Sequence, residues 1–258
     1  MTKRKKRALS TEDARKVRQR GYDDALEFAL AIGLSRDYEN NIQAKKDVID
    51  KSGDSHSIKG GKKKWQIFLY RLERFRLDDG FRTMNGIGQL LADCINAFPA
   101  TITVYRRDKT SAKERLQTPM RELARRLREK RLLSAFLSKS IFNSGEVNYL
   151  TVKHNDIFHV FLNQDVVKVF TENLEVCNSK ALLPGQMPEQ KVLLRYKGKN
   201  LGELEMRNDS EIHYRELRFN MIKPKVMELL FEKLPQTGKV SDKVLVYGNA
   251  RKRFGRWK

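Results

Sequence analysis

Residues that build small disulfide-bonded or zinc-bound scaffolds are scarce in this sequence. Its 258 residues include two cysteines, Cys94 and Cys177, and four histidines. Two distant cysteines exclude a disulfide framework and a cysteine-based zinc site. Their apolar neighbours indicate small core residues in a reducing compartment. No pair of histidines has the spacing of a zinc motif such as H-E-x-x-H, so we do not expect a zinc site.

Long hydrophobic runs are also missing. No apolar stretch approaches the roughly 18 residues that a membrane span requires. The basic amino terminus, MTKRKKRALS, is not followed by the hydrophobic segment of a signal peptide. The sequence contains no G-x-x-x-x-G-K-[ST] loop and no serine nucleophile elbow, which disfavours nucleotide hydrolysis and serine-hydrolase chemistry. We therefore expect a cytoplasmic protein without a membrane partner.

Acidic residues are outnumbered by basic ones. The chain has 32 Asp and Glu against 53 Lys and Arg, a formal net charge of +21. Such an excess favours a polyanionic partner, above all nucleic acid. Basic residues concentrate at 1–20, 106–131 and 247–258, and each stretch is either a solvated surface or a set of phosphate contacts. In the helix expected near 121–131, Arg125 and Arg128 are candidate DNA-backbone ligands.

The hydrophobic pattern predicts a mixed α/β (α+β) fold. Apolar residues at helical spacing predict helices over 11–34, 65–75 and 84–98, a basic helix from Pro119 onward, and a helix within 219–234. Residues 45–59 predict a hairpin that turns at Gly53. Alternating or β-branched runs predict further strands at 101–105, 147–153, 158–162, 166–170, 191–196 and 201–206.

The hairpin at 45–59 carries the residue types that phosphodiester hydrolysis needs. Asp47 lies near the start of its first strand, and alternation places Ser57 and Lys59 on one face of the second. A carboxylate is a hard oxygen ligand of the kind that Mg²⁺ prefers. A neighbouring ammonium can position water and stabilise developing charge. The alternative is an ordinary hairpin with solvent-facing charges.

Four motifs in this order resemble the PD-(D/E)XK nuclease superfamily, which includes most type II restriction endonucleases. The family pattern is a helix with a Glu, an Asp at a strand end, (D/E)-X-K on the next strand, and Q-x-x-x-Y. The matching residues, within roughly 15–75, are Glu27, Asp47, Ser57-Ile58-Lys59, Gln66 and Tyr70. The chain departs from the pattern at Ser57, which replaces an acid, and no proline precedes Asp47.

The resemblance implies a restriction-endonuclease-like core, a central mixed sheet flanked by helices, and a β-rich region after it. It implies Mg²⁺-dependent hydrolysis of double-stranded DNA at a short specific sequence. Asp47 and the Ile58 carbonyl then hold the metal, with help from Glu27, and Lys59 acts on the attacking water beside Ser57. Gln66 and Tyr70 brace this site or contact the DNA backbone. A homodimer and a cognate DNA methyltransferase as genetic partner follow from the same analogy.

On this interpretation the chain divides into five parts. They are a flexible basic arm (1–14), a nuclease core (15–105), a basic helical segment (106–140), a β-rich DNA-recognition region (141–234) and a basic tail (235–258).

The segment 202–219 contains an alternative to the metal site of the hairpin and a set of candidate DNA ligands. Glu203 and Glu205 share a strand face, so they are either an exposed pair or an alternative metal site. The residues that follow combine planar and polar side chains, which read base edges in the major groove. The candidate DNA ligands here are Arg207, Asn208, Asp209, His213, Arg215 and Arg218.

A protein that binds nucleic acid without cutting it is the competing class. A charge of +21 fits a regulator or an RNA-associated factor as well as it fits a nuclease. However, the sequence has no zinc finger, no aromatic RNP motif and no persuasive helix-turn-helix.

Overall fold

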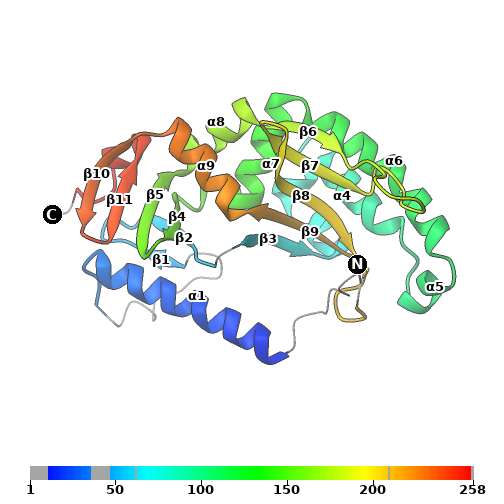
Figure 1. The fold of residues 1–258 in the computed structure, drawn as a ribbon, viewed down its shortest axis with the longest axis horizontal. Coiled ribbons are helices and arrows are strands. Elements are labelled where there is room, and N and C mark those ends of the chain that lie inside the picture. The colour runs from blue at the N-terminus through cyan, green and yellow to red at the C-terminus, as the bar shows by residue number, and fades with distance from the viewer. Residues whose placement is uncertain (1–10, 36–46, 62, 209, 257–258) are drawn as a thin grey trace.

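The computed structural model describes residues 11–35, 47–61, 63–208 and 210–256. It has a mixed α/β fold with two separate β-sheets, as expected for the fold class, and helices pack on both sheets (Figure 1). No described helix combines the length and apolar character that crossing a membrane requires.

The first sheet has six strands in the order β1-β2-β4-β5-β11-β10. Their bounds are β1 Val48–Ile49, β2 Ser55–Lys59, β4 Tyr149–His154, β5 Ile157–Leu162, β11 Val244–Tyr247 and β10 Gln236–Ser241. The sheet is mixed, because β2 pairs with β4, and β11 with β5, in parallel, whereas the other pairs are antiparallel. The predicted hairpin at 45–59 is confirmed as β1 and β2.

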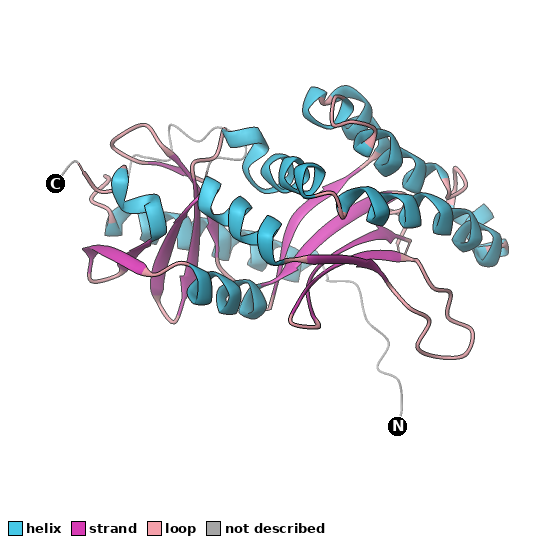
Figure 2. Ribbon diagram, turned by 90° about the horizontal axis from the view of Figure 1, so that it is seen from above, coloured by secondary structure: helices cyan, strands magenta, loops and turns pink. Residues whose placement is uncertain are grey.

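The second sheet has five strands, all antiparallel, in the order β3-β9-β8-β7-β6. Their bounds are β3 Lys64–Tyr70, β9 Glu216–Ile222, β8 Lys199–Arg207, β7 Lys191–Tyr196 and β6 Glu175–Asn178. Figure 2 shows helices along one side of this sheet. The opposite side carries charged side chains such as Lys191 and Glu205.

Nine α-helices lie within the described residues. They are α1 Thr11–Ala31, α2 Leu72–Leu77, α3 Asp79–Arg82, α4 Ile87–Asn96, α5 Ile102–Arg107, α6 Lys109–Leu127, α7 Lys130–Phe142, α8 Asn163–Asn173 and α9 Lys223–Lys233. Two 3₁₀ helices, η2 Asn143–Gly145 and η3 Gly248–Lys252, complete the described elements. The helices predicted from 11 and within 84–98 are confirmed as α1 and α4.

Two hydrophobic clusters hold the molecule together. The larger joins the helices to the second sheet and to one face of the first, where Leu150 and Val152 point. The smaller lies on the other face of the first sheet, where α1 contributes Phe28 and the C-terminal segment contributes Phe254. Because side chains alternate along β4, neighbouring residues enter different clusters. The first sheet is therefore buried on both faces, which suits the parallel pairing of its inner strands.

Several sequence predictions are wrong at the level of single elements. Residues 65–70 are strand β3 rather than helix, because they pair with β9. Residues 101–105 and 166–170 belong to helices α5 and α8 rather than strands. In α8 the buried residues Val166, Val169 and Phe170 follow the i, i+3, i+4 spacing of a helix face. By contrast, the helix predicted within 219–234 is confirmed as α9, which begins at Lys223 after residues 219–222 end strand β9.

The C-terminal region is a structural part of the first sheet. The basic tail expected over 235–258 is wrong for residues 236–252, which form β10, β11 and η3. Strand β11 pairs in parallel with β5, and its residues Val244 and Val246 are buried. The apolar residues of this stretch therefore outweigh its basic ones in deciding its structure.

Candidate active site

The β1–β2 hairpin positions the residues that the family resemblance singles out. Val48 lies opposite His56 across the hairpin, and Ile49 lies opposite Ser55. The Asp50 carboxylate accepts hydrogen bonds from the backbone N–H groups of Ser52 and Asp54, at 2.8 and 3.1 Å. Gly53 adopts a positive φ of 81°, which glycine tolerates without strain. A turn fixed by its own side chain therefore sets the register of the two strands.

Asp47, Ser57 and Lys59 line one cavity of about 140 Å³. The alternation along β2 places Ser57 and Lys59 on the same face. Asp47 immediately precedes β1 and donates its N–H to the His56 carbonyl at 3.0 Å, which brings it across from Ser57. Tyr70, from β3 of the second sheet, lines the same cavity. The cavity therefore lies where the two sheets meet, and four of the predicted site residues share it.

One oxygen of the Asp47 carboxylate is held by the backbone. Its Oδ2 accepts a hydrogen bond of 2.7 Å from the Ile58 N–H. This bond fixes the carboxylate against the middle residue of Ser57-Ile58-Lys59. Within the described part of the chain, Oδ1 makes no hydrogen bond, so it is available to a ligand in the cavity.

Ser57 and Lys59 differ in their exposure. Ser57 is buried, with 6% of its surface accessible, whereas Lys59 is half-buried at the end of β2. The Lys59 ammonium makes no ion pair with any described residue. An ammonium that no described residue pairs, beside a carboxylate-bearing cavity, is suited to contact an anionic substrate.

Lys139 and Asn143 are cavity residues that the sequence analysis missed. Lys139, on α7, donates hydrogen bonds to the Asn143 side-chain oxygen at 2.9 Å and to the Asp78 carboxylate at 2.8 Å. Both residues line the cavity together with Asp47 and Lys59. No sequence spacing connects α7 to the hairpin, since only tertiary packing brings them together. Unlike Lys59, Lys139 is neutralised by a carboxylate of the protein itself.

Among the described residues that line the cavity, Asp47 is the one carboxylate that could hold a metal ion. Among the described residues, no three His, Cys, Asp or Glu side chains gather as a metal site. Mg²⁺, however, is commonly held by one or two carboxylates together with waters and substrate phosphates. Asp47 Oδ1 is a donor of the required hard-oxygen type. The Ile58 carbonyl is of the same type, but Ile58 is not among the residues that line the cavity. The residues present would fit one Mg²⁺ whose remaining ligands come from water and substrate oxygens.

Glu27 lies on the other side of the first sheet. The α1 helix packs on the face that carries His56, whose ring centre is 4.9 Å from that of Phe28. The Glu27 carboxylate binds the ammonium groups of Lys153 at 2.6 Å and Lys243 at 3.0 Å. The hydrogen bond from Lys153 is the main reason that the pKa of Glu27 is below its ordinary value. The structure therefore does not bring Glu27 together with Asp47 and Lys59.

His56 belongs to a buried polar network behind the hairpin. Its Nδ1 lies 2.9 Å from the Thr151 hydroxyl, and its Nε2 lies 3.2 Å from the Asp50 carboxylate. Burial lowers the pKa of His56 although Asp50 opposes the shift. The side chain points away from the cavity that Ser57 and Lys59 line.

Gln66 and Tyr70 both lie on β3 but differ in placement. Tyr70 lines the cavity and stacks on Phe68, with ring centres 4.7 Å apart. Burial raises the pKa of its hydroxyl. Gln66 is exposed and does not line the cavity, because the ladder to β9 shifts between Gln66 and Phe68. The Q-x-x-x-Y spacing therefore brings only its tyrosine to the site.

The Glu203 and Glu205 carboxylates are neutralised by basic side chains. Glu203 binds Lys64 at 2.6 Å and Lys191 at 3.1 Å, and Glu205 binds Lys191 and Arg218. Burial acts to raise the pKa of Glu203, but Lys64 and Lys191 outweigh it and the pKa is lowered. Both carboxylates form an ion-pair cluster on β8 rather than an open pair of metal ligands.

The expected base-reading segment makes several contacts within the protein. Asn208 donates to the Tyr105 hydroxyl at 2.8 Å, His213 lies 2.8 Å from Glu216, and Arg215 donates to the Asn96 side chain at 3.1 Å. Arg218 binds Glu205 as described, and Arg207 ends β8 opposite Glu216. Asp209 lies outside the described residues. DNA contact by this segment remains a prediction.

Arg125 and Arg128 lie on the exposed side at the end of α6. Arg125 makes a two-bond ion pair with Glu122, at 2.7 and 2.5 Å, and Arg128 donates to the Val176 carbonyl at 3.2 Å. A phosphate contact at either residue must compete with these bonds.

Comparison of the chain with protein-family models, with curated proteins and with solved structures gives no match. The family resemblance therefore depends on the motif residues and on their placement in the fold.

Proposed function

We propose that the protein is a metal-dependent endonuclease of the PD-(D/E)XK type that cuts double-stranded DNA at a short specific sequence. On this proposal it acts as a type II restriction endonuclease. The single observation that carries the proposal is the shared cavity of Asp47, Ser57 and Lys59. The three residues fall at the family spacing and meet on one face of a hairpin, with the carboxylate fixed by the Ile58 N–H.

Asp47 and Lys59 have complementary roles in the proposed reaction. Asp47 Oδ1 and the Ile58 carbonyl would hold Mg²⁺, which would supply positive charge to the scissile phosphate and make water more acidic. Lys59 orients the attacking water and stabilises the negative charge that develops on the phosphate. Tyr70 contacts the DNA backbone at the rim of the cavity. Glu27 and Gln66 are not part of this mechanism, because neither side chain lines the cavity.

Ser57, in the place of an acid, bears on how many metal ions the proposed site would hold. A hydroxyl is a much weaker ligand for Mg²⁺ than the carboxylate that the family pattern has in this place. Since Asp47 is the only carboxylate among the described residues that line the cavity, we infer that the enzyme uses one metal rather than two.

The substrate and partners of this enzyme follow from the same proposal. The charge of +21 favours a nucleic-acid substrate, and a symmetric duplex site favours a two-fold homodimer. A DNA methyltransferase that protects the same sequence is the genetic partner. The same charge also favours the second candidate function, a nucleic-acid-binding protein without catalytic activity.

A plasmid cleavage assay separates the two functions. Purified protein is incubated with supercoiled plasmids of mixed sequence, with Mg²⁺ or with EDTA. Discrete linear fragments that require Mg²⁺ are the expected result. Plasmid that is bound and shifted on a gel but stays intact, over many plasmid sequences, contradicts the nuclease proposal and favours the binding protein.

A further inference from the structure

Half of helix α1 projects from the body of the protein. Every described side chain from Arg15 to Asp23 is exposed, including Val17 at 57% and Tyr22 at 53%. Only the second half of the helix is anchored, through Ala25, Phe28 and other buried residues. In Figure 1, α1 runs past β1 and β2 and continues below β3. A helical segment without tertiary contacts is marginally stable by itself, so a partner that covers it adds stability.

The projecting half begins at the end of the strand that carries the proposed catalytic lysine, on the sheet face opposite the cavity. Asp24 of α1 lies against Gly60, the residue that follows Lys59, so closely that a Cβ on Gly60 would stand 1.8 Å from Asp24 Oδ2. Asp24 also binds Lys153 on the neighbouring strand β4 at 2.9 Å. Arg15 precedes Asp24 by roughly 14 Å along the helix axis at 1.5 Å per residue. That length matches about four base pairs at 3.4 Å each.

The projecting half carries basic groups that have no partner among the described residues. The guanidinium groups of Arg15, Arg18 and Arg20 make no hydrogen bond or ion pair with any described residue, whereas Lys16 binds Glu12. Arg15, Arg18 and Tyr22 recur at i, i+3 and i+7, so they share a helix face. Arg20, two positions after Arg18, lies on the other side of the helix. Unpaired arginines on a projecting helix suit the backbone of a nucleic acid.

We propose that the projecting half of α1, residues 15–23, lies along the phosphate backbone of duplex DNA within about four base pairs of the scissile phosphate. Arg15 and Arg18 bind phosphates from their shared face, and Arg20 binds a phosphate from the other side of the helix. The inference rests on the proposed nuclease function, since it uses the position of Lys59 to locate the DNA.

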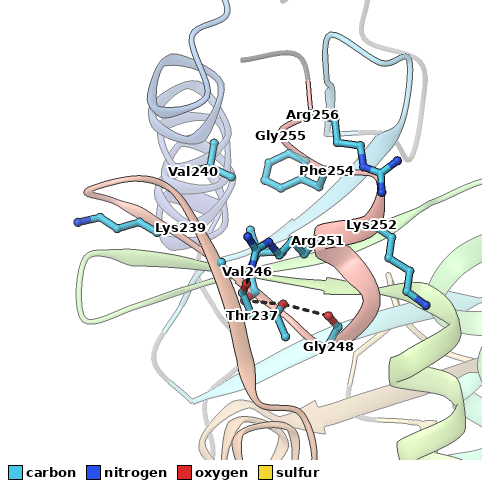
Figure 3. A pocket seen from close by; sticks show the side chains of 11 residues that line it. Thr237, Lys239, Val240, Val246, Gly248, Arg251, Lys252, Phe254, Gly255 and Arg256 are labelled. Carbon is cyan, nitrogen blue, oxygen red and sulfur yellow. Dashed lines mark hydrogen bonds between the residues drawn. The ribbon is translucent and has the colours of Figure 1, made fainter.

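The first test compares two variants that lose the same charge. Arg15→Gln/Arg18→Gln/Arg20→Gln removes the α1 arginines. The control Lys239→Gln/Lys252→Gln/Arg256→Gln removes three basic groups that line a cavity of about 690 Å³ at the C-terminal end of the first sheet (Figure 3). Binding of a fluorescent duplex is measured by anisotropy over a range of salt, with Ca²⁺ in place of Mg²⁺ to prevent cleavage. All six side chains are exposed or half-exposed, so both variants are expected to fold.

The α1 variant is expected to lose at least tenfold more affinity than the control. Its plot of log K against log salt is expected to be less steep by about three units, because each lost phosphate contact removes about 0.9. Equal losses in both variants would mean that only net charge matters, and would overturn the inference. So would a change in oligomeric state of the α1 variant, measured by sedimentation without DNA, that accounts for its weaker binding.

The second test locates the helix on DNA. A single Arg18→Cys variant, after its native thiols are checked for lack of labelling, carries an iron chelate that cleaves nearby sugars. Cuts within about four base pairs of the position that the enzyme hydrolyses with Mg²⁺ support the inference, and cuts only further away overturn it. If the unmodified protein binds DNA through α1 but never cleaves with Mg²⁺, the nuclease proposal fails while the DNA contact of α1 stands.

Discussion

The Arg253 guanidinium lies 2.6 Å from the Asp54 carboxylate, which joins the C-terminal segment to the turn of the β1–β2 hairpin. Asp54 is almost completely buried and also accepts a hydrogen bond of 3.2 Å from the Tyr149 hydroxyl. The next residue, Phe254, packs edge-on against His56, with ring centres 4.9 Å apart. The hairpin that carries Asp47 and Lys59 is therefore held from behind by residues almost 200 positions later in the chain.

Removing the Arg253 guanidinium is expected to destabilise the protein and loosen the hairpin. Arg253→Met leaves the buried Asp54 carboxylate without its cation. The Arg253 side chain is more than half exposed, so we expect a loss of about 1–2 kcal/mol in the free energy of unfolding rather than the larger cost of a fully buried pair. Urea unfolding measures the loss, and hydrogen exchange over residues 47–59 should become faster.

The matched control for this prediction is Arg251→Met, since Arg251 bonds to the Thr237 carbonyl and not to the hairpin. Faster exchange over residues 47–59 in both variants, or in neither, would show that Arg253 has no specific part in holding the hairpin.

Stability is expected to fall between pH 6.5 and pH 4 because of His159. Burial lowers the pKa of His159 from 6.5 to about 4, and its Nδ1 lies 2.9 Å from the Tyr247 hydroxyl. The unfolded chain binds a proton near pH 6.5, whereas the folded protein does so only near pH 4. The folded state is therefore favoured fully above pH 6.5 and loses up to about 3 kcal/mol as the pH falls through this window.

A His159→Gln variant isolates this contribution, because carboxylates titrate alike in both proteins. Urea unfolding at pH 7, 5.5 and 4 should show a smaller decline for the variant than for the wild type. Parallel declines would mean that His159 titrates normally in the folded protein.

Substitutions of Asp47 and Ser57 are expected to have different effects on DNA cleavage. Asp47→Asn removes the only carboxylate among the described cavity residues and should abolish cleavage, because the proposed Mg²⁺ would lose a charged ligand. Ser57→Glu supplies the acid of the family pattern and should retain activity. Single-turnover cleavage over a range of Mg²⁺ concentrations measures both effects.

Glu205→Gln serves as the comparison, since Glu205 is occupied by Lys191 and Arg218. A fully active Asp47→Asn together with an inactive Glu205→Gln would assign catalysis to the β8 carboxylates and reject the hairpin.

The local part of the site could be predicted from the sequence, and the distant part could not. The turn at Gly53 and the alternation of Ser57 and Lys59 are encoded within a few residues, and the hairpin forms as predicted. Lys139 reaches the cavity from a helix 80 residues away, and no local spacing signals such a contact. Glu27 matches its motif in sequence, but α1 packs on the opposite face of the sheet, which separates it from Asp47.

Short apolar runs account for the errors in secondary structure. The run WQIFLY fits a helix as well as a strand, and pairing with β9 decides for the strand. The run VVKVF contains β-branched residues typical of strands, yet it lies in α8, where Val166 and Phe170 pack into the core. Tertiary packing decides the secondary structure of both runs, and their local sequence does not show that packing.

The role of Lys59 is tested most directly by single-turnover cleavage of a specific duplex by Lys59→Ala. Lys51→Ala is the control, because Lys51 is an exposed lysine on the turn of the same hairpin and does not line the cavity. Binding with Ca²⁺ should stay within about tenfold of the wild type for both variants, since only interactions made in the transition state are lost. The account predicts that Lys59→Ala binds DNA and does not cut it, while Lys51→Ala cuts normally. Cleavage by Lys59→Ala at the wild-type rate would contradict the account.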